Sequence, residues 1–315
     1  MRASPADPAG EKANPAEARR AGFVALLGAP NVGKSTLLNQ LVGTKVSIVS
    51  PKVQTTRRRI IGISIVASTQ IMFVDTPGIF APRRRLDRAM VDAAWSGAAD
   101  ADLVCLLIDA ARGIRREEHL ILDGLARTRK RCLLVVNKVD LIKRTKLLPL
   151  VAELNRKAAF DATFMISALS GDGCAELMDA VVAAMPEGPW LFPEDQLSDL
   201  SNRAMAAEIT REQLYHQLHQ ELPYAATVET EGWAEAPDGG EVRIDQTIYV
   251  QRDTQKAIVL GKRGSRIKEI GEKARHELEA LLDMRVHLFL FVKVREDWTE
   301  DRERYREMGL DFPKG

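Results

Sequence analysis

The chain has 315 residues, 45% of them hydrophobic and 28% charged, a balance typical of a soluble globular protein that is long enough for two domains. The formal net charge is only +1, so bulk charge favours no anionic partner and any basic surface must be local. The dispersed cysteines Cys105, Cys132 and Cys174 include no Cys-x-x-Cys pair for a metal, which predicts reduced thiols in a cytosolic protein. No apolar run reaches the roughly 18 residues that a membrane-spanning helix needs.

The first half of the chain predicts an α/β domain. Residues 1–20 are rich in Ala, Pro and charge and lack the apolar segment of a secretory signal, so we expect a disordered tail. From 21 to 186, nearly continuous apolar strands such as FVALLG, QIMFVD, DLVCLLIDA, RCLLVVN and ATFMISAL alternate with helical stretches such as 115–129 and 174–185. Such strands predict a mostly parallel sheet that is covered on both faces.

The pattern changes after residue 186. Three prolines and a glycine in PEGPWLFPED mark 187–198 as a linker, and an amphipathic helix is expected at 199–220. EVRIDQTIYV and RVHLFLFVKV then alternate with period two, which predicts strands with one buried face, and APDGGE supplies a hairpin turn before the first of them. Between these strands we expect helices at 253–260 and 265–282, so 199–315 predicts an α+β domain.

The first glycine-rich loop, GAPNVGKS, matches G-x-x-x-x-G-K-[ST] between a strand and a helix. In such a P-loop the backbone amides turn toward phosphate oxygens, Lys34 reaches the β- and γ-phosphates, and the Ser35 hydroxyl binds Mg²⁺. The first domain is therefore predicted to be a P-loop NTPase domain. The residues assigned to the nucleotide from this loop are Gly28, Ala29, Pro30, Asn31, Val32, Gly33, Lys34 and Ser35.

Guanine specificity is predicted from NKVD, which follows an apolar strand and so lies where such sheets bind ligands. The Asp140 carboxylate can accept hydrogen bonds from guanine N1–H and the exocyclic amine, a pattern that adenine lacks. Asn137 is expected to face the guanine carbonyl edge and Lys138 to pack over the base. The full assignment adds Val139 and, from the tripeptide after TFMI, Ser167, Ala168 and Leu169.

Hydrolysis is assigned to DTPG and to the segment before it. Asp75 is expected to hold Mg²⁺ through a water and the Gly78 amide to donate to the γ-phosphate, with Thr76, Pro77 and Ile79 beside them. A switch segment also needs a Thr that meets Mg²⁺ when γ-phosphate is present. Within 50–60, Thr55 and Thr56 are candidates, and we favour Thr56. The predicted metal ligands are Ser35 and Thr56, and the predicted catalytic residues are Lys34, Thr56, Asp75 and Gly78.

Ile79 stands where Ras-like switches carry a Gln that orients the attacking water, and Ile cannot do that. Two interpretations of Asn31 stay open. In one, its side chain helps to hold a K⁺ ion near the phosphates, as in relatives with Asn at this position; in the other, it stabilises the loop.

The second glycine loop, GKRG at 261–264, joins the two helices of the second domain. Its glycines permit close backbone approach, and its basic residues face phosphates in a KH-type arrangement. A glycine helix cap with no ligand is the alternative. The basic balance favours RNA, with Ile258, Val259 and Ile267 as groove walls. The predicted RNA-binding residues are Gly261, Lys262, Arg263, Gly264, Ser265, Arg266 and Lys268. The arginine runs 57–59 and 83–85 are interpreted as solvated surface in catalysis, with docking to an anionic partner as the alternative.

GAPNVGKS, DTPG, NKVD and SAL, in this order over about 22–186, resemble a Ras-like G domain of the TrmE-Era-EngA type. With GKRG in a type II KH arrangement, and with LFPED and ELPY, the chain from about residue 22 onward resembles the Era family. The resemblance implies a GTPase that uses Mg²⁺, binds the 3′ region of small-subunit ribosomal RNA and assists assembly of the 30S subunit. It also implies a monomeric, cytoplasmic protein with peripheral attachment to the inner membrane.

Two other functions stay open. The second domain of a G-protein switch can bind a protein instead of RNA, in which case no salt-dependent RNA binding is expected. An RNA-modification GTPase would need a further active site, and the sequence shows no clustered Cys or His to serve it.

Overall fold

The computed structural model describes residues 19–52, 55–82, 84–128, 130–218, 222, 225–296 and 302–313. The tail predicted at 1–20 lies outside these ranges except for its last two residues, and Arg20 is already the first residue of a strand. None of the described helices is long and apolar enough to cross a bilayer.

The first domain is built on a sheet with the strand order β2-β3-β1-β4-β5-β6. The strands are β1 (Arg20–Leu27), β2 (Ile60–Val66), β3 (Thr69–Asp75), β4 (Leu103–Asp109), β5 (Cys132–Asn137) and β6 (Ala162–Met165). All pairs are parallel except β2 with β3, so the mostly parallel α/β sheet is confirmed. β2 was not predicted. It runs antiparallel along the edge, and its register is set by pairing with β3.

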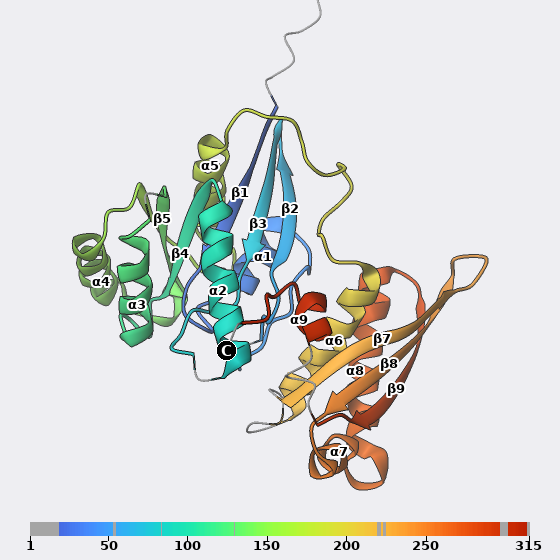
Figure 1. Ribbon diagram of the computed structural model, residues 1–315. Coiled ribbons are helices and arrows are strands. Elements are labelled where there is room, and N and C mark those ends of the chain that lie inside the picture. Colours follow the sequence, from blue (N-terminus) through green and yellow to red (C-terminus); the bar gives the residue numbers. More distant parts are fainter. Residues whose placement is uncertain are drawn as a thin grey trace, which may run out of the picture.

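Helices cover both faces of this sheet, which explains why the strands are apolar throughout. Figure 1 shows α2 on one face and α1 with α5 on the other. The helices of this domain are α1 (Lys34–Val42), α2 (Arg85–Asp100), α3 (Arg116–Leu125), α4 (Arg144–Lys157) and α5 (Cys174–Ala184). The three cysteines are free and buried, and burial raises the pKa of Cys132 to about 12.

The segment predicted as a linker, 187–198, crosses from β1 to the edge strand β2, where Glu187 bridges to Arg20 and Ser198 to Gly62. Gln70 Oε1 accepts hydrogen bonds from the amides of Leu191 (2.7 Å) and Phe192 (3.0 Å), and Trp190 Nε1 donates to the Ser68 carbonyl at 3.1 Å. These bonds attach the segment to β3 and its preceding turn, which fixes where the second domain begins.

The second domain has the element order α6 (Asn202–Gln217), β7 (Ala226–Glu235), β8 (Glu241–Val250), α7 (Asp253–Leu260), α8 (Ser265–Leu282) and β9 (Arg285–Val294). Its strands pair in the order β7-β8-β9, antiparallel and then parallel. The order α-β-β-α-α-β confirms the predicted type II KH topology. Both helices of the central pair begin and end at the predicted residues, and Val242, Ile244, Ile248 and Val250 are buried as expected. β7 was implied only by the hairpin turn.

The end of the described chain returns to the first domain. In α9 (Arg302–Glu307) the Tyr305 side chain is buried, and together with Leu310 it forms an apolar cluster with Leu86, Ala89 and Met90 of α2. Figure 1 shows α9 beside α2, next to the C-terminus. The region 199–315 therefore contains the KH elements and a segment packed on the other domain.

Candidate nucleotide site and RNA-facing loop

The P-loop runs from the end of β1 to the start of α1. The Lys34 ammonium group lies inside the loop and donates to the carbonyls of Gly28 at 3.2 Å and Ala29 at 3.1 Å. Burial lowers the pKa of Lys34 to about 8, against the opposing effect of Asp75. A buried cation that bonds only to carbonyls is poised to exchange them for phosphate oxygens.

Gly33 caps α1 with φ 101°, a left-handed conformation that favours glycine. A Cβ atom at this position would lie 2.3 Å from Asn137 Nδ2. The loop is therefore pressed against the end of β5, and no larger residue fits.

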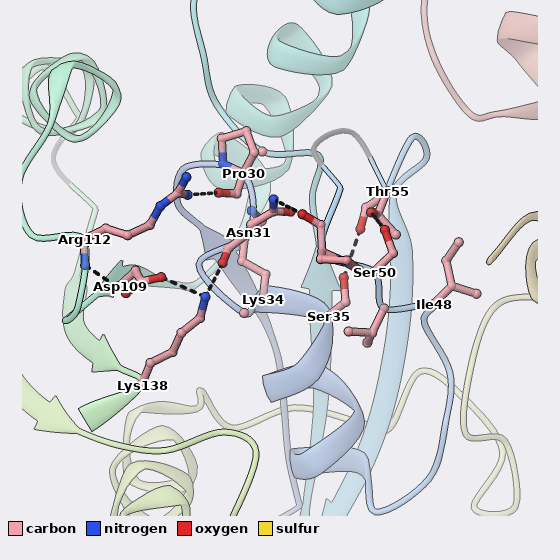
Figure 2. A pocket seen from close by; sticks show the side chains of 15 residues that line it. Pro30, Asn31, Lys34, Ser35, Ile48, Ser50, Thr55, Asp109, Arg112 and Lys138 are labelled. Atoms are coloured by element: carbon pink, nitrogen blue, oxygen red, sulfur yellow. Dashed lines mark hydrogen bonds and ion pairs between the residues drawn. The ribbon is translucent and has the colours of Figure 1, made fainter. Parts of the chain in front are cut away.

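A pocket of about 420 Å³ opens over the P-loop, between the switch segment and the ends of β4 and β5. Figure 2 shows Lys138 and Arg112 reaching P-loop carbonyls from one side and Ser50 with Thr55 lying on the other. The predicted P-loop and switch residues that line this pocket are Pro30, Asn31, Gly33, Lys34, Ser35, Thr55, Thr56 and Gly78.

A cluster of oxygen atoms at the pocket floor fits a hard divalent cation. Asp75 Oδ2 accepts hydrogen bonds from Ser35 Oγ at 2.6 Å, Ser47 Oγ at 2.9 Å and Thr56 Oγ1 at 3.4 Å, and the hydroxyls of Ser35 and Thr56 lie 2.9 Å apart. The other carboxylate oxygen of Asp75 is buried without a hydrogen-bond partner. Burial raises the pKa of Asp75. A carboxylate with one orphaned buried oxygen and three hydroxyl groups around the other suits Mg²⁺, which prefers oxygen ligands and retains several waters.

Thr55 and Thr56 point to different partners. The Thr55 hydroxyl donates to the Lys52 carbonyl at 2.7 Å and lies 2.6 Å from Ser50 Oγ, away from the cluster. Thr56, the favoured candidate, is the one whose hydroxyl lies in the cluster.

The DTPG segment packs directly on the P-loop. A Cβ at Gly78 would lie 2.7 Å from the Pro30 nitrogen, and the Ile79 amide donates to the Gly28 carbonyl at 3.1 Å. The Thr76 hydroxyl donates to the Leu26 carbonyl at 2.8 Å, so it anchors the segment to β1. The Ile79 side chain is buried, which agrees with its lack of a role in orienting water.

In the part of the site predicted to bind guanine, the Asn137 side chain forms hydrogen bonds that link three segments of the chain. Its Nδ2 donates to the Val32 carbonyl at 2.8 Å, and its Oδ1 accepts from the amides of Lys138 (2.8 Å) and Ala168 (2.9 Å). These partners are protein groups, so its expected contact with a guanine edge stays a prediction. Asp140 and Leu169 are exposed, and Ser167 and Ala168 are buried.

Sequence reasoning missed two residues that line the pocket: Asp109, the last residue of β4, and Arg112, which follows it. Asp109 Oδ2 forms an ion pair with Lys138 Nζ at 2.8 Å, and the same ammonium group donates to the Asn31 carbonyl at 2.6 Å. Arg112 Nη1 donates to the Pro30 carbonyl at 3.3 Å. The signal was available, because DLVCLLIDA ends at the same sheet edge as NKVD.

The second glycine loop is exposed and strongly bent. Gly261 (φ 71°), Arg263 (φ 53°) and Gly264 (φ 77°) all have positive φ, and a Cβ at Gly264 would meet nothing within 4 Å. Lys262, Arg263 and Lys268 are exposed, whereas Arg266 Nη1 donates to the Ile258 carbonyl at 3.0 Å. This backbone is open to approach at the N-terminus of α8, a favourable place for a phosphate.

One predicted groove wall is corrected. Val259 is 0% exposed and belongs to the core of the second domain, because it lies on the face of α7 that packs on the sheet, whereas Ile258 is 46% exposed.

Comparison with known proteins gives both halves a family. Residues 23–138 match the model described as "50S ribosome-binding GTPase", and residues 221–299 match the KH domain model. These matches cover the P-loop pocket and the GKRG loop.

Whole-chain relatives agree. GTPase Era of Mesorhizobium japonicum is 61% identical over 296 residues, which cover 94% of this chain and 95% of that protein. GTPase Era of Rhizobium meliloti is 62% identical over 295 residues, 94% of each chain. A crystal structure of Era in complex with MgGDPNP and nucleotides 1506–1542 of 16S ribosomal RNA superposes with a TM-score of 0.87 at 40% identity, covering 92% of this chain and 99% of that one. The chain therefore belongs to the GTPase Era family, which pairs a GTP-hydrolysing P-loop domain with a KH domain.

Proposed function

We propose that this chain binds the 3′ region of small-subunit ribosomal RNA through the GKRG loop and assists assembly of the 30S subunit, with GTP controlling the RNA-bound state. The observation that carries the proposal is the presence in one chain of a P-loop pocket and an exposed basic loop at a helix N-terminus. A similar solved Era holds MgGDPNP together with nucleotides 1506–1542 of 16S ribosomal RNA, which supports it.

In the proposed GTPase site, Lys34 exchanges its carbonyl partners for β- and γ-phosphate oxygens. Ser35 and Thr56 hold Mg²⁺ directly and Asp75 holds it through water, and the ion supplies charge stabilisation to the transferring phosphoryl group. The Gly78 amide donates to the γ-phosphate, which draws the switch segments toward the P-loop. Asp140 reads the guanine edge, and Lys138 lies over the base with its ammonium group on Asn31 and Asp109.

A K⁺ ion is proposed beside the phosphates for two reasons. Ile79 cannot orient water, and Arg112 donates to the Pro30 carbonyl instead of to the oxygen cluster proposed for Mg²⁺. Asn31 Nδ2 donates to the Pro51 carbonyl at 2.7 Å, so this residue joins the P-loop to the switch segment where such an ion would lie. Turnover measured in KCl and in NaCl at equal ionic strength tests the idea. Equal rates would leave Asn31 with the loop-stabilising role alone.

The RNA proposal is tested with a labelled single-stranded fragment from the 3′ end of small-subunit ribosomal RNA. Binding is measured with a GTP analogue, with GDP and without nucleotide, at two salt concentrations. The double variant Lys262→Asp, Arg263→Asp should abolish RNA binding and leave nucleotide affinity unchanged. It replaces two positive charges that would contact phosphates, and each such contact contributes to affinity and to its salt dependence.

The matched control is Lys273→Asp, Arg275→Asp, which makes the same charge change on α8, the helix that follows the loop, at residues that pair with Glu269 and Glu279. Retained binding in both double variants would contradict the role of the GKRG loop, and the absence of salt-dependent RNA binding in the unaltered chain would favour a protein partner for the second domain. A monomeric, cytoplasmic protein with peripheral contact to the inner membrane completes the proposal.

A further inference from the structure

The switch segment is held by the KH domain over much of its length. Glu212 of α6 accepts a hydrogen bond from the Val49 amide at 2.7 Å. It also forms an ion pair with Lys45, which in turn pairs with Glu277 of α8. The Lys52 ammonium donates to the carbonyls of Tyr215 and Leu218 at the end of α6. The loop that must close over γ-phosphate is thus anchored to the other domain.

The anchoring is tightest on the two sides of Thr56. Before it, Arg211 Nη2 donates to the Thr55 carbonyl at 2.6 Å. After it, the Arg57 guanidinium donates to the Ala226 carbonyl at 2.9 Å and to the Tyr215 hydroxyl at 2.8 Å. Thr56 therefore lies between two residues whose positions are set by α6 and the start of β7, and its hydroxyl is 2.9 Å from Ser35 Oγ.

The side chains that hold the switch segment on the two sides of Thr56 are buried, and the two arginines among them are charged. Arg211 is 2% exposed, Arg57 3% and Tyr215 0%, so the interpretation of the 57–59 run as solvated surface is wrong for Arg57. Burial alone would lower the pKa of Arg211, but the Glu208 carboxylate outweighs it and the pKa is raised. Both guanidinium groups lie over the Tyr215 ring, at 5.2 Å for Arg211 and 5.7 Å for Arg57. When one partner of a buried charge-assisted hydrogen bond is removed, the other partner is left buried and unsatisfied, which costs free energy.

We propose that Arg211 of the KH domain is a positioning residue for Thr56, so that the second domain completes the metal-binding geometry of the GTP state. The inference rests on the proposed role of Thr56. In GDP the γ-phosphate is absent and a switch Thr has no metal contact to make. Removing Arg211 should therefore weaken binding of GTP but not of GDP.

The test measures the affinity of the full chain for GDP and for a non-hydrolysable GTP analogue over a Mg²⁺ titration. Thr56→Ala should lower analogue affinity relative to GDP about tenfold, the effect of one contact to a charged partner. Arg211→Ala should lower it in the same direction, by about threefold to tenfold, and raise the Mg²⁺ concentration at half-saturation. Because Arg211 acts through Thr56, the double variant should be no worse than Thr56→Ala alone.

Arg203→Ala is the matched control, since Arg203 lies on the same helix and bonds to the carbonyls of Thr230 and Glu231 within its own domain. It should leave the preference for the GTP analogue unchanged. Tyr215→Phe removes only the hydroxyl that holds Arg57 and should give a smaller loss in the direction of Arg211→Ala, even if Arg211→Ala unfolds.

Unchanged selectivity in Thr56→Ala would overturn the role of Thr56 and the inference with it. A loss in Thr56→Ala with full selectivity in Tyr215→Phe and in folded Arg211→Ala would overturn the inference alone. Additive losses in the double variant would also overturn it, because Arg211 would then act by another route.

Discussion

The carboxylate of Asp109 and the ammonium group of Lys138 form an ion pair at 2.8 Å that joins the end of β4 to the end of β5. The other carboxylate oxygen of Asp109 accepts hydrogen bonds from the amides of Ala111 at 2.9 Å and Arg112 at 3.1 Å. Lys138 has φ 64°, so its backbone adopts the left-handed conformation at the same point. Asp109 thus shapes its own turn and fixes the side chain proposed to cover the base.

Asp109→Asn separates these two roles. The Asn side chain keeps an oxygen for the turn amides but loses the charge that holds Lys138. We expect GDP and GTP affinity to fall by about threefold to thirtyfold, the range of a charge-assisted bond partly offset by solvent, with little change in melting temperature. Equilibrium titration with fluorescent nucleotide measures it. An equal loss of thermal stability would assign the effect to the turn instead.

Nucleotide binding is expected to take up a proton above pH 8. In the nucleotide-free protein, burial lowers the pKa of Lys34 from its ordinary value of 10.5 to about 8, and bound phosphate will raise it again. Below pH 8 the ammonium is already charged and no uptake is expected; between pH 8 and about 10 the neutral amine must gain a proton. GDP affinity should therefore decline as pH rises above 8.

Calorimetry at pH 9 in buffers of different ionisation enthalpy measures the proton uptake directly, and the same titrations at pH 6.5 are the reference. Lys34→Met should show no uptake at either pH. Equal proton release or uptake in the wild type and in Lys34→Met would assign the proton to another group.

Gly33→Ala is expected to damage the P-loop in two ways. The substitution strains a residue with φ 101°, and its Cβ would lie 2.3 Å from Asn137 Nδ2. Gly43→Ala at the other end of α1 is the control, because Gly43 has φ 82° but open space around its Cβ position. Strain alone costs about 1–3 kcal/mol of unfolding free energy in both variants. Only Gly33→Ala should also lose nucleotide affinity, by at least about tenfold; equal affinity in the two variants would contradict a role for this close contact.

The local sequence predicted the exact bounds of some helices. The helices at 253–260 and 265–282 are separated by Gly261 and Gly264, whose positive φ values stop one helix and start the next. Parallel strands were predicted because both their faces are buried. β2 and β7 were missed: β2 follows a run of arginines, and β7 carries polar residues on an open face, so their pairing depends on distant partners.

The contact of the KH domain with the switch could not be predicted for a similar reason. The local sequence around Arg57 is compatible with either a buried or a solvated side chain. Its burial depends on Tyr215 and Ala226, which lie far along the chain. The motifs of the nucleotide site, by contrast, were visible because each lies at a strand end with fixed spacing.

Tyr305 lets the position of α9 be tested. Its ring packs edge-on against Phe312 with centroids 4.9 Å apart and contributes to the cluster that covers Leu86, Ala89 and Met90. α2 begins at Arg85, shortly after the DTPG segment at 75–78, so the amide protection of α2 reports on the part of the chain that follows DTPG. Tyr305→Ala removes an aromatic ring from this cluster, a change that costs about 3–5 kcal/mol where the site cannot collapse. We expect α9 to release and amide exchange over 85–100 to accelerate, while exchange in β8 stays slow. Tyr305→Phe keeps the ring and should retain the protection of α2. Fast exchange throughout both domains in Tyr305→Ala would instead show that the cluster supports the whole fold.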